Sequence, residues 1–239
     1  MGAEEIWTPL KLIEWTSVHF AKRGVDSPRL DAEVLLAHAL DTTRVALYTA
    51  FDKPVSAAEL VRYRELVRRR ANREPLAYLV GHREFWSLSI AVDPSVLIPR
   101  PATETLVEAA LKLARAAGAA RLGDVATGSG AIVAALAKEL SDARFVASDS
   151  CAAALAVAKK NLDALGLSAR VDLVHGDLLE PMVPHAPFDL LVANPPYVPS
   201  AEIPTLEPEV WAEPKIALDG GADGLDVLRR LIPGSKNLL

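Results

Sequence analysis

The stretch that decides the fold reads Phe188-Asp189-Leu190-Leu191-Val192-Ala193-Asn194-Pro195-Pro196-Tyr197. Its apolar run, broken by one aspartate, is typical of a strand buried on both faces, as parallel strands usually are. The prolines end that strand, because neither can donate a hydrogen bond to a neighbouring strand and a residue before proline is disfavoured in a helix. The sequence therefore predicts a stiff turn at the carboxyl end of a central parallel strand, where open α/β sheets bind their ligands.

Strand-like and helix-like segments alternate before this turn. The apolar patterns predict strands at residues 122–126, 144–148, 170–175 and 188–193. Apolar residues at helical spacing predict helices at residues 131–140 and 152–165. Repeated strand–helix units predict an α/β fold with a parallel sheet, right-handed crossovers and helices on both faces.

The chain before residue 98 has a different character. Residues 1–74 show helical patterns separated by turn signals, which predict a small helical domain. Residues 75–97 carry aromatic and β-branched side chains in partial alternation, which predict a β-hairpin connector. The α/β domain is then expected at residues 98–239. Six arginines near the end of the first part leave two interpretations open, a solvated helix end or a docking patch: Arg62, Arg64, Arg68, Arg69, Arg70 and Arg73.

Composition narrows the class of protein. The chain has 239 residues, of which 51% are hydrophobic and 24% charged, as in soluble globular proteins. One cysteine, Cys151, excludes an internal disulfide framework, and no Cys/His cluster has ligand spacing, so we expect a reducing compartment and no metal site. Because we find neither a signal-peptide pattern nor a stretch of membrane-spanning length, we expect a cytoplasmic protein. The formal net charge of -5 argues against a protein that mainly grips nucleic-acid phosphates.

A glycine-containing turn, Ala126-Thr127-Gly128-Ser129-Gly130, lies between the first strand and the first helix of the alternating region. Glycines let backbone amides approach a ligand closely and aim the following helix N-terminus at it. An acidic residue about twenty residues further on, at the end of the next strand, would hold ribose hydroxyls. Asp149 stands there. Turn and acid together predict a site for a nucleoside-containing cofactor.

Two further positions bear on the identity of that cofactor. A dinucleotide site has a third glycine three residues after the second, and Val133 stands at that position, which weakens an assignment to NAD. After the third strand, Asp177 can accept a hydrogen bond from an adenine amino group while Leu178 packs on the ring. A turn-capping aspartate is the alternative interpretation of Asp177.

Further segments extend these motifs along nearly the whole chain. They are residues 27–36, residues 73–81, Phe85-Trp86, residues 97–104 and residues 213–226. Together with the Asp-x-x-Thr-Gly-Ser-Gly turn and Asn194-Pro195-Pro196-Tyr197, they resemble the bacterial release-factor glutamine methyltransferases. The resemblance implies a Rossmann-like class I methyltransferase fold, with a helical domain that recognises the substrate. It also implies S-adenosylmethionine (S-adenosyl-L-methionine) as the cofactor.

The resemblance further implies a substrate and a set of site residues. The substrates are peptide chain release factors, methylated on the side-chain amide nitrogen of the glutamine in their Gly-Gly-Gln motif. We expect a monomer, with no nucleic-acid substrate and no membrane contact. The catalytic residues are Asn194, Pro195, Pro196 and Tyr197. The cofactor-binding residues are Ala126, Thr127, Gly128, Ser129, Gly130, Asp149, Asp177, Leu178 and Asn194. Arg100 and Glu104 either close over the cofactor or belong only to the loop and the helix start.

Amide chemistry gives the Asn-Pro-Pro-Tyr turn a role. An amide nitrogen is a poor nucleophile because its lone pair is delocalised into the carbonyl group. Acceptors for its two N–H protons return electron density to nitrogen, and the Asn194 side-chain oxygen and the Pro195 carbonyl can be those acceptors. Tyr197 then supplies a flat wall against the planar amide.

The chain departs from the family's pattern at two places. Ala126 stands where the family usually has a glycine, and if that residue needs a positive φ, alanine costs about 1–2 kcal/mol. The family also continues past a helix that begins near Asp223 into strands that complete the sheet. We therefore expect a methyltransferase domain truncated at its C-terminus, in which the strand that bears Asn194 is an edge strand.

Other functions remain open at this stage. An adenine amino-methyltransferase acting on nucleic acid could use the same turn, because the exocyclic amine of adenine is also a planar nitrogen, although such enzymes usually need a basic channel and flip the base out. An inactive module that binds the cofactor without transferring its methyl group is the alternative from another class. A dehydrogenase is the most distant alternative.

Overall fold

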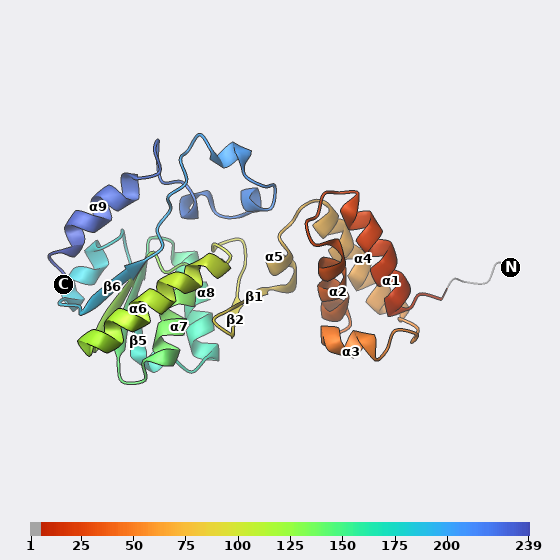
Figure 1. The fold of residues 1–239 in the computed structure, drawn as a ribbon, viewed down its shortest axis with the longest axis horizontal. Helices are drawn as coiled ribbons and strands as arrows, with labels where there is room; N and C mark the ends of the chain where they lie inside the picture. Colours follow the sequence, from red (N-terminus) through yellow and green to blue (C-terminus); the bar gives the residue numbers. More distant parts are fainter. Residues whose placement is uncertain (1–5) are drawn as a thin grey trace. The chain divides into compact units, whose positions relative to one another are not determined.

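The computed structural model describes residues 6–239 and divides the chain into two compact units, Met1–Val80 and Gly81–Leu239. The elements of the first unit are α1 (Pro9–Ala21), α2 (Pro28–Ala39), α3 (Arg44–Tyr48), α4 (Ala57–Ala71) and α5 (Leu76–Val80). Figure 1 shows this helical unit in red to gold. Within residues 6–239 no helix is both long and apolar enough to cross a membrane.

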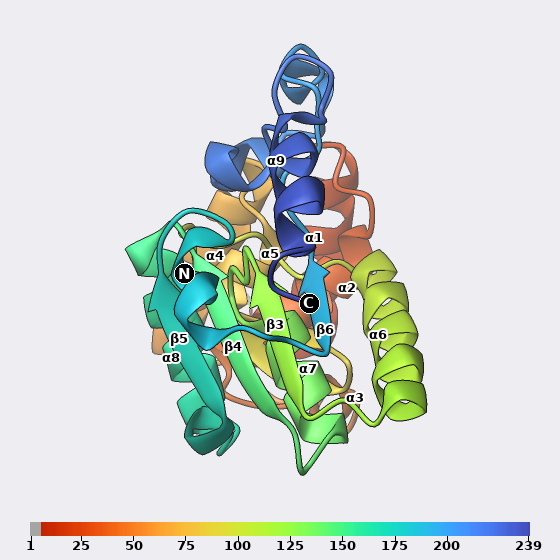
Figure 2. The ribbon, with the colours of Figure 1, turned by 90° about the vertical axis from the view of Figure 1, so that its left-hand side faces the viewer.

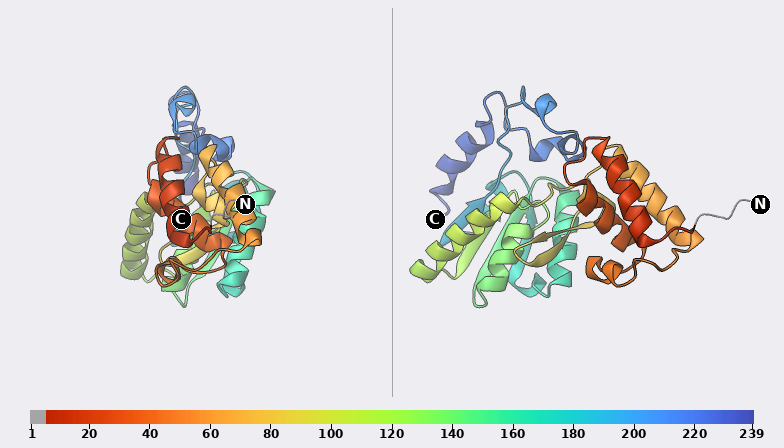
Figure 3. Two further views of the ribbon diagram at one scale, coloured as in Figure 1. Left: turned by 90° about the vertical axis from the view of Figure 1, so that its right-hand side faces the viewer. Right: turned by 45° about the vertical axis from the view of Figure 1, so that its right-hand side comes forward.

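Local sequence explains where these helices begin. The Thr8 side chain accepts a hydrogen bond from the backbone of Lys11 at the start of α1, and Ser56 and Glu59 form a capping box at the start of α4. Prolines occupy the first helical position of α1 and α2, where no N–H is needed. Helices α1, α2 and α4 lie side by side, as Figure 3 shows in red and orange. They enclose an apolar core that includes Ile13 and Leu36.

Several of the arginines near residue 70 belong to the internal structure of this unit. Arg70 is buried and its guanidinium lies 2.7 Å from the buried carboxylate of Asp31. A buried charge is tolerated when it is paired in this way. Further partners are Asp41 for Arg62, Glu65 for Arg68, Glu74 for Arg69 and the Gly24 carbonyl for Arg73.

The second unit carries the strands. They are β1 (His82–Phe85), β2 (Leu88–Ala91), β3 (Arg121–Val125), β4 (Arg144–Asp149), β5 (Val171–His175) and β6 (Leu190–Ala193). Its α-helices are α6 (Glu104–Ala117), α7 (Ala131–Glu139), α8 (Ala152–Ala164) and α9 (Asp226–Ser235). Its short 3-10 helices are η1 (Pro101–Thr103), η2 (Ser168–Arg170), η3 (Glu180–His185), η4 (Ile203–Thr205), η5 (Val210–Ala212) and η6 (Lys215–Ala217).

The stretch between residues 75 and 97 differs in part from a plain hairpin. Its first residues form α5, which belongs to the first unit, and the hairpin itself is β1 and β2. The hairpin turn is formed by Trp86 and Ser87, with φ of 52° and 56°. Such a turn normally takes Asn-Gly. Here the Trp86 backbone N–H donates to Glu104, and its indole N–H donates to Glu139, so contacts outside the hairpin hold the turn.

The main sheet has the order β5-β4-β3-β6 and is parallel throughout. Helices α6, α7 and α8 cover one face, and Figure 2 shows α9 and η3 on the opposite face. The predicted α/β fold with helices on both faces is therefore confirmed. Strand β6, which precedes Asn194, lies at one end of the order, as expected.

Two features explain the sequence at the start of β6. The Asp189 carboxylate, the one charge in the apolar run, accepts hydrogen bonds from the backbone amides of Ala120 and Arg121 at 2.8 Å. It therefore ties the start of β6 to that of β3. The Phe188 N–H donates to the Leu238 carbonyl at 2.7 Å, and Leu231 of α9 packs with Val125 and Val146 of the sheet. Residues after 225 thus cover one sheet face.

Candidate active site

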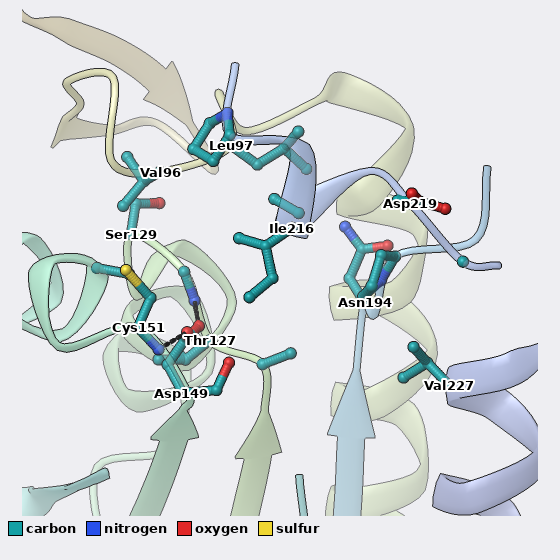
Figure 4. Close-up of a pocket in the computed structure, with 18 of the residues that line it drawn as sticks. Val96, Leu97, Thr127, Ser129, Asp149, Cys151, Asn194, Ile216, Asp219 and Val227 are labelled. Carbon is teal, nitrogen blue, oxygen red and sulfur yellow. Dashed lines mark hydrogen bonds between the residues drawn. The ribbon is translucent and has the colours of Figure 1, made fainter. Parts of the chain in front are cut away.

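A cavity of about 660 Å³ opens at the carboxyl ends of β3, β4 and β6 (Figure 4). This volume lies within the range of small-molecule sites. The predicted residues that line it are Ala126, Thr127, Gly128, Ser129, Asp149, Asp177, Leu178, Asn194 and Pro196. Gly130, Pro195 and Tyr197 are not among its lining residues. Segments that follow four different strands thus meet at one place, as a ligand site at the edge of a parallel sheet requires.

The glycine turn has a left-handed backbone conformation at three of its five residues. Ala126, Gly128 and Gly130 all have positive φ, of 59°, 56° and 76°. At Gly130 a side chain would also meet Ala158 of α8 at 3.1 Å, whereas nothing lies within 4 Å of the position where a Gly128 side chain would begin. The first part of the turn is therefore open to a ligand. The alanine at 126 occupies a conformation that costs it about 1–2 kcal/mol.

Asp149 is tied to this turn. Its Oδ2 accepts the Gly128 N–H at 2.8 Å and its Oδ1 accepts the Cys151 N–H at 2.9 Å. Figure 4 shows the carboxylate between the two strand ends. Because each carboxylate oxygen has a second acceptor site, Asp149 is held in place and can still accept hydrogen bonds from a ligand.

The buried acid Asp124 is hydrogen-bonded to the glycine turn through Thr127. No role was predicted for Asp124 from the sequence. Its side chain is 1% exposed and accepts the Thr127 hydroxyl at 2.6 Å. Burial raises the pKa of the Asp124 carboxyl to about 7, although the hydrogen bond from Thr127 works in the opposite direction. The signal for this residue is its place as the first member of the Asp-x-x-Thr motif, on an otherwise apolar strand.

The Asn-Pro-Pro-Tyr turn contributes Asn194 and Pro196 to the lining of the cavity. Asn194 is partly buried, and its side chain makes no hydrogen bond with residues 6–239. Figure 4 shows it extending from the end of β6. Pro195 is buried and Tyr197 is 61% exposed. The turn therefore offers the Asn194 amide inside the cavity and an aromatic ring outside it.

A second segment clamps this turn from its far side. The Val198 N–H donates to the Leu218 carbonyl, and the Gly220 N–H donates to the Val198 carbonyl, both at 2.9 Å. Side chains at Gly220 and Gly224 would lie 2.7 Å and 2.3 Å from the Tyr197 backbone. Only glycine fits at these two positions, which explains Gly220 and Gly224.

Arg100 and Glu104, the two residues that could close over the cofactor, lie in different places. Arg100 lines the cavity and forms an ion pair with Glu213. Glu104 does not line the cavity, and its carboxylate accepts the Trp86 N–H at 2.8 Å. It therefore holds the hairpin turn.

Asp177 has a partner that local sequence does not reveal. It lines the cavity next to Leu178, and it forms an ion pair with Arg230 of α9. Arg230, Val227 and Asp226 also line the cavity, so α9 contributes to one wall. Among residues 6–239 no group of three His, Cys, Asp or Glu side chains is arranged to hold a metal ion.

Comparisons with known proteins agree with this geometry. Residues 11–81 match the model for the PrmC N-terminal domain, and residues 101–221 match the model for the Methyltransferase small domain. The hMettl16 catalytic domain, solved in complex with the MAT2A 3'UTR hairpin 6, superposes with a TM-score of 0.53 at 22% identity. That match covers 73% of this chain and 64% of the other, and it supports the fold alone.

Curated relatives match over nearly the whole chain. The release factor glutamine methyltransferase of Geobacter sulfurreducens is 48% identical over 236 residues, which are 98% of this chain and 81% of that protein. The protein of the same name from Rhodopirellula baltica is 45% identical over 238 residues, 98% of this chain and 80% of that protein. With its methyltransferase fold and its Asn-Pro-Pro-Tyr turn beside the glycine turn, the chain belongs to the release factor glutamine methyltransferase family.

Proposed function

We propose that this enzyme methylates the side-chain amide nitrogen of the glutamine in the Gly-Gly-Gln motif of peptide chain release factors, with S-adenosylmethionine as the methyl donor. One observation carries the proposal. The Asn194 amide, without a hydrogen bond to the described part of the chain, lies in the same cavity as the glycine turn and Asp149. The names of the curated relatives support the same substrate.

The cavity residues fit this cofactor. The open backbone at Gly128 and the acceptor sites left on Asp149 suit a ribose, and Leu178 with Asp177 suits an adenine ring and its amino group. Thr127 and Ser129, on either side of Gly128, also line the cavity. When bound, S-adenosylmethionine supplies a methyl group on a positively charged sulfur. The chain has to align the acceptor nitrogen with it.

Asn194 and Pro195 carry out that alignment. The Asn194 Oδ1 and the Pro195 carbonyl each accept one N–H of the substrate amide, which fixes the amide plane and returns electron density to nitrogen. Proline has no N–H, so no donor of its own competes at this position. Each such hydrogen bond contributes about 0.5–1.5 kcal/mol, so most of the acceleration must come from alignment.

Tyr197 and the helical unit complete the proposed assignment. The exposed Tyr197 ring offers a flat wall for the planar amide as a peptide loop enters. The first unit, which matches the PrmC N-terminal domain, is the part we assign to recognition of the release factor. We further propose that the enzyme acts as a monomer in the cytoplasm, where release factors work.

Mass spectrometry tests this function. The chain is incubated with a release factor and S-adenosylmethionine, and the tryptic peptide that contains Gly-Gly-Gln is analysed. One added methyl group on the glutamine is the expected product. Methyl incorporation into DNA with an unmodified glutamine would support the adenine methyltransferase, and tight cofactor binding without any transfer would support the inactive module.

The variant Asn194→Ala sharpens this experiment. It is expected to abolish transfer, because the plane of the substrate amide is no longer held in line with the methyl group, and to leave the dissociation constant for the cofactor within a few-fold of wild type. Asn237→Ala, at an exposed position outside the cavity, is the matched control and should retain full activity. Normal turnover by Asn194→Ala would exclude the proposed role of the turn.

A further inference from the structure

We infer that Glu213 is a positioning residue for methyl transfer. Its buried carboxylate connects two segments that line the cavity and thereby holds the Asn-Pro-Pro-Tyr turn in place. The inference rests on the proposed function. Glu213 does not line the cavity, so it acts through the residues that it holds.

The contacts of Glu213 bridge distant parts of the chain. Its side chain is 1% exposed. Its Oε2 accepts the backbone N–H of Ile98 at 3.0 Å, and its Oε1 accepts a hydrogen bond from the guanidinium of Arg100. Both partners belong to the segment of residues 96–100, which we call the wall. Val96, Leu97, Pro99 and Arg100 of the wall line the cavity.

The residues directly after Glu213 form another side of the same cavity. Residues 214–217, which we call the roof, all line it. Figure 4 shows Ile216 of the roof between Leu97 of the wall and the strand end that bears Asp149. Glu213 therefore fixes the start of the roof to the wall through one carboxylate.

The residues directly after the roof are hydrogen-bonded to the residue that follows the Asn-Pro-Pro-Tyr turn. Leu218 and Gly220 form the two backbone hydrogen bonds with Val198, the residue that follows Tyr197. One short segment thus runs from Glu213 to the turn and is pinned at both ends. If the Glu213 end is released, the segment is held beside Asn194 from its other end alone, through the hydrogen bonds with Val198 and Ser200.

The cofactor side of the cavity does not depend on this connection. The Thr127 N–H donates to the Ser148 carbonyl, and the Gly128 N–H donates to Asp149, so the glycine turn is held by its own strand and by β4. The loss of Glu213 should therefore impair alignment of the acceptor amide much more than binding of the cofactor.

The connection between Glu213 and the wall depends on the ion pair with Arg100. A buried carboxylate is costly without a partner, and the Arg100 guanidinium supplies that partner while remaining 39% exposed. The variant Glu213→Gln keeps an oxygen that can accept the Ile98 N–H, but its NH₂ group then faces the donors of Arg100. It therefore breaks the connection with little change in side-chain volume.

The test measures turnover, cofactor affinity and hydrogen exchange on the full chain. For Glu213→Gln we expect kcat on the release factor to fall at least tenfold and the dissociation constant for S-adenosylmethionine to change less than threefold. The backbone amides of Val198 and Gly220 should exchange at least tenfold faster. Glu207→Gln, at an exposed position a few residues before the roof, is the control and should match wild type in all three measurements.

A second substitution guards against a purely structural effect. In the double variant Glu213→Gln/Arg100→Gln the amide NH₂ at position 213 no longer faces the donors of a guanidinium, so slow amide exchange at Val198 should return and kcat should recover at least threefold over Glu213→Gln. Wild-type exchange rates in Glu213→Gln, or equal losses in kcat and cofactor affinity, would overturn the inference. Absence of transfer by the wild-type chain would instead contradict the proposed function, and the exchange measurement would still decide the role of Glu213.

Discussion

The Asp149 carboxylate accepts the backbone N–H of Gly128 at 2.8 Å, so the acid at the end of β4 is bonded to the turn that follows β3. The two residues are predicted separately from the sequence, one for a ribose and one for close backbone approach. Their hydrogen bond makes them one unit, because a shift of either residue moves the other. Cofactor binding should therefore depend on Asp149 in two ways, through the acceptor sites that face the ligand and through the shape of the turn.

Asp149→Asn should weaken binding of S-adenosylmethionine at least tenfold, or by about 1.4 kcal/mol. The Gly128 and Cys151 N–H groups donate to different oxygens of Asp149, so an asparagine, with an NH₂ group in place of one oxygen, loses one of these two hydrogen bonds. The NH₂ group also disfavours a ribose hydroxyl that donates. Isothermal titration calorimetry measures the dissociation constant. Asp142→Asn, at an exposed position away from the cavity, should bind as wild type does. Unchanged affinity in Asp149→Asn would contradict the assignment of the ribose site.

Ala126→Gly should raise the free energy of unfolding by about 1 kcal/mol, because glycine adopts the positive φ of 59° without the steric cost that alanine bears. Urea unfolding monitored by circular dichroism measures this change. Ala156→Gly, at an exposed position within α8, should have the opposite effect and lower the free energy of unfolding by about 1 kcal/mol. A destabilising effect of Ala126→Gly would mean that the turn is not strained.

The stability of the chain should report the titration of Asp124. Its pKa in the folded state is about 7, above the value of 3.8 for an ordinary aspartate, so the folded state binds the proton more tightly than the unfolded state. The contribution of this carboxyl to the free energy of unfolding therefore falls as the pH rises from about 4 to 7, by up to about 1.4 kcal/mol per pH unit. Above pH 7 the contribution is constant.

The variant Asp124→Asn, which does not titrate, isolates this contribution. The free energy of unfolding of wild type minus that of Asp124→Asn should decrease between pH 4.5 and pH 7 in urea titrations. The same difference taken with Ala156→Gly, which changes no ionisable group, should show no such decrease. A difference for Asp124→Asn that is independent of pH would contradict the raised pKa.

Arg230→Ala should strengthen binding of S-adenosylmethionine modestly. The substitution frees the Asp177 carboxylate to accept a hydrogen bond from the adenine amino group. Because both partners of this ion pair are about half exposed, the gain should not exceed about fivefold. Arg229→Ala, whose partners are Asp223 and Asp226, is the matched control and should leave the affinity unchanged. Weaker binding by Arg230→Ala would mean that Arg230 itself contacts the cofactor.

Local sequence predicts the sheet and the two motif turns well. Apolar strands of four to six residues, such as β4 and β6, are recognisable from composition, and a proline pair or a glycine pair marks where each turn must lie. The strand limits differ by one or two residues, as at the start of β6, where Asp189 lies just before the strand and its side chain accepts a hydrogen bond from the backbone of Arg121 in β3.

Contacts between distant residues are what sequence patterns do not reveal. Nothing near Glu213 indicates that its carboxylate meets Ile98 and Arg100, and nothing near Asp177 indicates Arg230. The hairpin turn at Trp86 contains no glycine or asparagine that would mark it in the sequence. Glutamates from α6 and α7 stabilise it instead. The roof of the cavity has short 3-10 turns with no regular apolar period, so its place over the site follows only from these long-range contacts.

The most direct measurement of the central claim is the extent of methylation at the Gly-Gly-Gln glutamine, followed by mass spectrometry over time with wild type and Asn194→Ala side by side. We expect one methyl group on the glutamine amide nitrogen with wild type, none with Asn194→Ala, and similar cofactor affinity for both. Equal methylation by the two proteins, or a methyl group on any other residue or on nucleic acid alone, would contradict it.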